Sequence, residues 1–241
     1  GSFLAEITKG RSDVPPIALG GDGDVQFSPD GAELCFVMNP DSFVATSTNN
    51  DLFVMSLPNG APRNITASNR ANDNSPRYSP NGRYIAYRAM ARPGFEADRL
   101  RLMLYDRRTG TASNLTENFD YSIDAISWSP DSKSLYFTVE DRGRSSIGVV
   151  STRGGDAKLV IRGSYDEAVR TAPDGKTLVF KRQSATRPVD LWSAPARGGE
   201  ARPLTAVNEA SLAGIEMNPI EEFVFEGALG DAVQGFVLKP P

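Results

Sequence analysis

Apolar and polar residues alternate along this chain in short runs, and one ten-residue pattern of that kind occurs four times. Each copy places an aromatic residue or threonine before a turn of the Pro-Asp-Gly type, and a run of alternating apolar residues follows. Proline presets φ and glycine tolerates positive φ, so this arrangement predicts a tight turn between two strands. The four predicted β-hairpins cover residues 27–36, 78–87, 128–137 and 171–180.

Two further strands are predicted after each hairpin. An apolar run that ends in a turn begins at Asp51, Arg101, Ser146 and Asp190. A shorter run follows it, beginning at Arg63, Ser113, Ala157 and Ala201. The whole unit recurs at intervals of about 40 to 50 residues, which is typical of one four-stranded propeller blade. The predicted fold is therefore all-β, a β-propeller of WD40-like repeats with about four blades and a partial blade at each end.

The repeats also predict where each blade lies. We expect blades at about 22–66, 72–116, 122–161 and 165–205, and partial units at 1–19 and 211–238, within one incomplete propeller spanning 1–241. In the last unit Asn218-Pro219 stands in for the usual turn, and the opening Gly1-Ser2 resembles an expression scar. We expect the chain to begin and end in the middle of a larger propeller.

One column of polar residues runs through the predicted innermost strands, three positions before each turn proline. The residues two and four positions before the proline are mostly apolar, as expected for side chains that pack between blades. The polar column therefore predicts residues that line a central channel. An alternative is that these long side chains only solvate an open inner edge. The column consists of Gln26, Arg77, Ser127, Arg170 and Glu216.

The composition excludes several kinds of active site. The chain contains no histidine and one cysteine, Cys35, in an apolar run that favours a buried position. A Ser-His-Asp triad needs an imidazole, and the usual zinc site needs histidine or clustered cysteine. The 30 acidic residues lie mostly in turns, which favours solvated acids over a catalytic carboxylate pair. We assign no catalytic residue, no metal site and no cofactor.

Charge and hydropathy exclude two kinds of partner. The net charge of −4 is spread without long runs of one sign, so no nucleic-acid partner is expected. No apolar stretch approaches the about 18 residues of a membrane span.

Three segments resemble a known family. Residues 47–52, 75–87 and 92–99 are similar to the propeller of bacterial prolyl-oligopeptidase-family serine peptidases, in the acylaminoacyl-peptidase and dipeptidyl-aminopeptidase-like branch. In that family, a strand similar to residues 235–241 leads into an α/β-hydrolase domain that carries the catalytic triad. The resemblance implies a propeller that caps the active site of a peptidase acting on short peptides near their N-terminus, and that is not catalytic by itself.

Two alternatives stay open at this stage. The turn pattern also occurs in TolB-like propellers, which are non-enzymatic and bind protein partners. A propeller enzyme with its active site in the central channel ranks last, because histidine is absent. We further expect the exposed packing faces of an incomplete propeller to cause self-association. The resemblance favours a periplasmic or secreted location over the cytoplasm.

Overall fold

The computed structural model describes residue 8 and residues 12–241. Of the partial unit expected at 1–19, residues 1–7 and 9–11 lie outside the described residues, and residues 12–19 form bends and irregular structure without a strand. The next residues of the chain contain a short 3₁₀ helix, η1 (Asp22–Asp24), which leads directly into the first strand.

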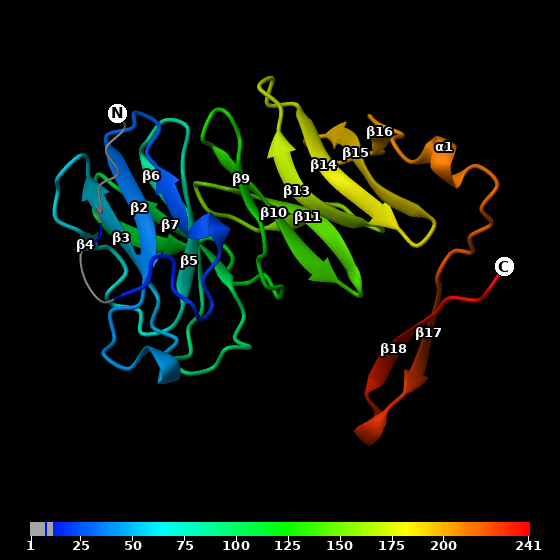
Figure 1. Cartoon of the computed structure of the whole chain (residues 1–241), viewed down its shortest axis with the longest axis horizontal. Helices are drawn as coiled ribbons and strands as arrows, with labels where there is room; N and C mark the ends of the chain where they lie inside the picture. Colours follow the sequence, from blue (N-terminus) through cyan, green and yellow to red (C-terminus); the bar gives the residue numbers. More distant parts are fainter. Residues whose placement is uncertain (1–7, 9–11) are drawn as a thin grey trace.

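Four antiparallel units of four strands follow one another along the chain, as predicted; the first two are separate sheets, and the last two join into one eight-stranded sheet (Figure 1). Within each unit the strands pair in sequence order, so each unit is one blade. Blade 1 contains β1 (Val25–Phe27), β2 (Glu33–Met38), β3 (Asp51–Ser56) and β4 (Arg63–Asn64). Blade 2 contains β5 (Asp73–Tyr78), β6 (Tyr84–Ala89), β7 (Arg101–Asp106) and β8 (Thr111–Asn114).

Blades 3 and 4 are built in the same way and are joined by one parallel bridge between Ser145 and Tyr165. Blade 3 contains β9 (Ile126–Trp128), β10 (Ser134–Asp141), β11 (Arg144–Ser151) and β12 (Lys158–Ile161). Blade 4 contains β13 (Tyr165–Thr171), β14 (Thr177–Ser184), β15 (Arg187–Pro195) and β16 (Arg202–Pro203). In Figure 1 the four blades follow one another from blue to yellow.

The predicted turns form as their residue types dictate. In the first blade Gly31 has φ of 71°, the left-handed conformation that glycine adopts without a steric cost. The Ser28 hydroxyl accepts the Glu33 N–H at 2.9 Å and donates to Asp30. The third blade has Ser132 at the glycine position, and it adopts φ of 59°. The Pro-Asp-Gly pattern thus predicts a turn even where the glycine is replaced.

Apolar side chains fill the space between successive blades. Cys35 and Leu52 of blade 1 pack with Ile85 of blade 2, and each is fully buried. Leu102 of blade 2 packs in the same way with Phe137 of blade 3. A third cluster joins blade 3 to blade 4. Because each blade covers the face of the next, the alternation along the strands determines the stacking.

The last part of the chain differs from the unit expected at 211–238. A single helical turn, α1 (Glu209–Leu212), is followed by an irregular segment that includes Asn218-Pro219. A two-stranded hairpin then forms from β17 (Glu221–Glu226) and β18 (Ala232–Val237), connected through the 3₁₀ turn η3 (Ala228–Gly230). The strand expected before Asn218-Pro219 is not formed, since no neighbouring strand lies beside it to accept its hydrogen bonds. Within the described residues, no helix has the length and apolar character needed to cross a lipid bilayer.

Candidate functional site

Four of the five predicted channel residues occupy the same place in their blades. Each lies on the innermost strand, in register with a residue of the second strand. The pairs are Gln26 with Cys35, Arg77 with Ala86, Ser127 with Tyr136, and Arg170 with Val179. The innermost strands also contact one another, since the Trp128 indole N–H donates to the Arg77 carbonyl at 3.0 Å.

Arg77 is the most constrained of these residues. Its guanidinium donates to the carbonyls of Gly23 and Pro76, each at 2.7 Å. Burial, together with the positive charges of Arg170 and Arg88, lowers the pKa of Arg77. Arg77 and Arg170 thus place positive side chains on the first strands of blades 2 and 4.

The remaining members of the column have different surroundings. Ser127 is buried, and the Gln26 side-chain carbonyl oxygen is buried without a hydrogen-bond partner among the described residues. Arg170 is exposed. Glu216 is exposed in the irregular segment before β17, so it does not join the other four in a strand register. The channel assignment stays a prediction.

The loops between the second and third strands lie at one end of the blades and differ greatly in length. In blades 3 and 4 they are tight turns at 142–143 and 185–186. In blades 1 and 2 they cover 39–50 and 90–100. The Gly94 N–H donates to the Thr48 hydroxyl at 2.8 Å and thereby ties the two long loops together.

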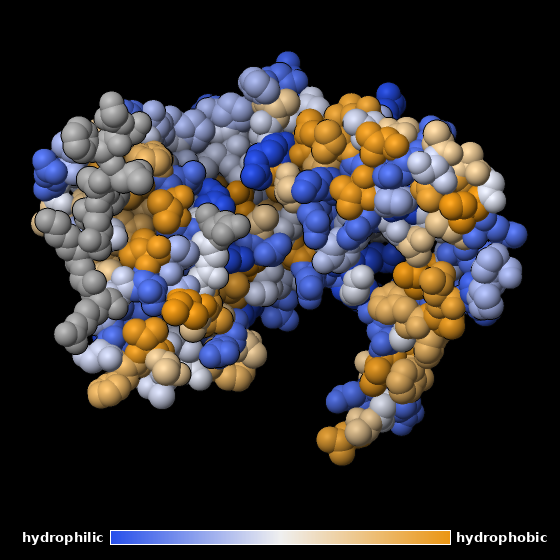
Figure 2. Space-filling view, in the orientation of Figure 1, coloured by the Kyte–Doolittle hydropathy of each residue, from blue (hydrophilic) through white to orange (hydrophobic). Residues whose placement is uncertain are grey.

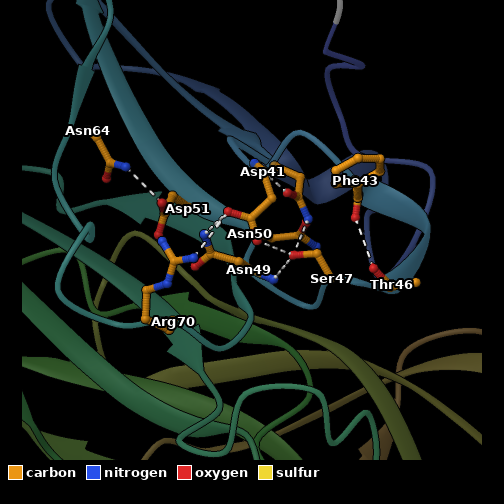
Figure 3. A network of polar contacts seen from close by, with 10 residues as sticks. Asp41, Phe43, Thr46, Ser47, Asn49, Asn50, Asp51, Asn64 and Arg70 are labelled. Carbon is orange, nitrogen blue, oxygen red and sulfur yellow. Dashed lines mark hydrogen bonds and ion pairs between the residues drawn. The ribbon is translucent and has the colours of Figure 1, made fainter.

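A polar network organises the first long loop (Figure 3). The Asp41 carboxylate accepts hydrogen bonds from Ser47 at 2.6 Å and from Asn49 at 3.0 Å, and it pairs with Arg70 at 3.3 Å. The hydrogen bond from Ser47 is the main cause of a lowered pKa at Asp41. The adjacent Asn50 side chain links the loop to Asn72 of the next blade at 2.9 Å.

The second long loop is built around Asp98. Its carboxylate accepts the backbone N–H groups of Ala91 at 2.7 Å and Arg92 at 2.9 Å, and it pairs with the Arg92 guanidinium at 3.1 Å. That guanidinium lies 3.9 Å from the centre of the Phe95 ring. The two long loops together line a pocket of about 360 Å³, whose rim includes the largely exposed Phe43.

A larger pocket of about 650 Å³ opens where blades 2, 3 and 4 meet. Arg88 lies in it and donates to the Asp124 carbonyl at 2.8 Å and to its carboxylate at 3.3 Å. Glu140 and Glu167 add acidic groups from two further strands. The excess of carboxylates suits a cationic group, but among the described residues no set of three acidic or cysteine side chains is arranged to hold a metal ion.

Sequence reasoning did not find these two pockets. Their residues come from loops and strand ends rather than from the repeated turn pattern. The one available signal was the length of the segments 39–50 and 90–100, which exceeds that of a tight hairpin connection.

The chain is similar to known proteins both in sequence and in fold. No family model matches the chain. Dipeptidyl-peptidase 5 of Porphyromonas gingivalis is 29% identical over 231 residues, which cover 95% of this chain and 34% of that protein. The chain therefore spans about a third of the length of this curated relative.

Two solved structures share the fold. The acylaminoacyl peptidase of Pyrococcus horikoshii matches 90% of this chain and 32% of its own, with a TM-score of 0.70 and 16% identity. A putative TolB from Agrobacterium tumefaciens matches 76% of this chain and 64% of its own, with a TM-score of 0.59 and 21% identity. The similarity to a peptidase covers more of the chain. The sequence similarity to dipeptidyl-peptidase 5 and the fold similarity to acylaminoacyl peptidase support the resemblance to the propeller of a prolyl-oligopeptidase-family serine peptidase.

Proposed function

We propose that this chain is the substrate-gating propeller of a serine peptidase that hydrolyses short peptides near their N-terminus, and that it is not catalytic by itself. The observation that carries the proposal is the sequence similarity to dipeptidyl-peptidase 5 along 95% of the chain. The chain contains no histidine, so it cannot supply the imidazole of a Ser-His-Asp triad.

The arrangement of polar groups supports a gating role. Both long loops and both pockets described above involve the same end of the blades, where they can contact a peptide before it reaches a catalytic domain. Arg77 and Arg170 add positive charge along the innermost strands, which favours the carboxylate of a short peptide over a neutral chain.

Substitutions in the longer gene product test the proposed substrate-gating role. Arg170→Glu reverses the charge at an exposed position of an innermost strand, and Arg202→Glu makes the same change on the outermost strand β16. We expect Arg170→Glu to change kcat/KM in a way that depends on peptide length between two and about twenty residues, and Arg202→Glu to leave it unchanged. Equal effects of the two substitutions at every length would argue against passage along the inner strands.

A TolB-like binding module is the second candidate, supported by the fold similarity to TolB. It would require a protein partner and no peptidase activity in the longer gene product. The dipeptidyl-peptidase relative favours the first proposal.

A further inference from the structure

Blades 2 and 4 share an irregular start to their innermost strands. β5 begins with Asp73 and β13 contains Asp166, and both aspartates are fully buried. Two residues later each strand has a residue with positive φ, Ser75 at 53° and Ala168 at 51°. The register with the second strand shifts at that point in both blades. Asp73 and Asp166 are therefore equivalent positions.

In blade 4 the buried aspartate has a cation as its partner. Asp166 lies opposite Arg182 in the strand register, and the two side chains form bonds of 2.7 and 2.9 Å. The guanidinium of Arg182 lies 5.3 Å from the centre of the Phe180 ring and 5.0 Å from that of Trp192. Blade 4 thus provides an aromatic and acidic setting for one guanidinium group.

In blade 2 the equivalent positions lack the arginine. Ala89 lies opposite Asp73, where blade 4 has Arg182. Tyr87 takes the place of Phe180, and its cross-strand partner Met103 takes the place of Trp192. The Asp73 Oδ1 atom accepts a hydrogen bond from Asn69 at 2.8 Å, whereas Oδ2 has no partner within the described part of the chain.

A pocket lies at this place between blades 1 and 2. It has a volume of about 510 Å³, and Asp73, Tyr87, Ala89 and Met103 all contribute to its wall. A buried carboxyl oxygen without a hydrogen-bond partner is costly, and a charge-assisted bond from a cation removes that cost. We propose that this pocket binds an alkylguanidinium ligand, either a free small molecule or an arginine side chain of a peptide, whose head group takes the place that Arg182 occupies in blade 4.

Two charged side chains of the pocket wall affect this site. Arg101, which pairs with Ala89 from β7, brings a positive charge, and Glu117 brings a negative one. Arg101 makes no hydrogen bond to Asp73, because Oδ1 is bonded to Asn69 and Oδ2 has no partner among the described residues. The ligand therefore enters beside Arg101 and does not have to break an existing ion pair of Asp73.

Calorimetric titration of the 241-residue chain with butylguanidinium tests the site. Butylurea has the same shape without the charge and is the matched probe. We expect saturable binding of butylguanidinium that is at least about tenfold tighter than that of butylurea. Titration with capped arginine amide is the second part of the experiment. Affinity equal to that of butylguanidinium shows that the guanidinium head group suffices. Higher affinity than that of butylguanidinium indicates that the ligand is an arginine side chain of a peptide.

Three variants identify the pocket. Ala89→Arg supplies the missing arginine from the chain itself, and Asp73→Asn removes the carboxylate, so we expect each to weaken butylguanidinium binding by at least about tenfold. Ala61→Arg adds the same charge at an exposed position between β3 and β4 and should bind as the unmodified chain does. A folded Ala89→Arg variant that binds as tightly as the unmodified chain would overturn the proposal, as would the absence of saturable binding to that chain. This test does not depend on peptidase activity.

Discussion

Asp166 and Arg182 form a two-bond ion pair between neighbouring strands of blade 4, with Asp166 fully buried and the Arg182 side chain 15% exposed. Removing the arginine would leave the carboxylate in an apolar setting without its partner. We therefore expect Arg182→Ala to lower the free energy of unfolding by about 3 kcal/mol.

Urea denaturation measures this change, and Arg187→Ala is the control. Arg187 lies on the same blade and is exposed, so its removal should cost less than about 1 kcal/mol. Equal losses for the two variants would show that the ion pair does not stabilise blade 4.

The hydrogen bonds of Asp98 should make the stability of the loop 90–100 sensitive to acid. Burial opposes the charged form, but the hydrogen bonds from Ala91 and Arg92 outweigh it and lower the pKa of Asp98 to about 2. A lowered pKa means that the stabilisation is present above the unfolded pKa of about 3.9 and is lost as pH falls toward 2. We expect Asp98→Asn to be less stable than the unmodified chain at pH 6, with the difference shrinking between pH 4 and pH 2.

Denaturation of both proteins at several pH values tests the Asp98 prediction. Asp120→Asn is a suitable control, since Asp120 lies in another loop and makes no comparable set of bonds in the described residues. A stability difference for Asp98→Asn that stays constant from pH 6 to pH 2 would contradict the assigned role.

Asp73 predicts the opposite pH dependence. Burial is the main cause that raises the pKa of Asp73 well above its usual value; the Asp51 carboxylate adds to the increase, and Arg101 opposes it. The folded chain therefore holds a proton that the unfolded chain has lost, and Asp73 costs stability as pH rises. We expect Asp73→Asn to gain stability relative to the unmodified chain as pH increases from 4 to 8. A loss of stability of Asp73→Asn relative to the unmodified chain between pH 4 and pH 8 would contradict this prediction.

The exposed faces at the two ends of the described chain predict self-association. Val25 and Phe27 of β1 are 42% and 62% exposed, whereas the equivalent Tyr78 of β5 is covered by its neighbours. Figure 2 shows further apolar residues along the β17–β18 hairpin. Phe223 and Phe225 of this hairpin are exposed, and their stacked rings have centroids 6.0 Å apart. Two copies could cover these faces by joining end to end.

Sedimentation equilibrium measures the association. We expect a mass above the 26.0 kDa of one chain at micromolar concentration, and a shift toward the monomer in Phe27→Asp. Ala61→Asp changes an exposed position between β3 and β4; it is the control and should associate as the unmodified chain does. A monodisperse monomer for the unmodified chain would contradict the prediction.

The sequence predicted the blades because the information for them is local. Each turn is encoded by proline, an acid or amide, and a residue that accepts positive φ, and each strand is encoded by alternation. The third turn was predicted although Ser132 replaces glycine, because apolar and polar residues still alternate in the flanking strands.

The candidate sites could not be read in the same way. The Asp41 network and the pocket around Arg88 combine residues from separate loops and blades, so only the stacking of blades brings them together. The equivalence of Ala89 and Arg182 depends on the strand registers of blades 2 and 4, which the sequence pattern does not specify. Glu216 fits the column of polar residues in sequence but lies in an irregular segment, because strand formation there needs a partner strand.

Hydrolysis of chromogenic acyl-amino-acid and dipeptide substrates, compared between this chain and the full-length gene product, tests whether the chain is the non-catalytic propeller of a peptidase. We expect activity in the full-length product and none in the chain alone. Activity in the chain alone would contradict it, and activity in neither would favour a binding propeller over a peptidase gate.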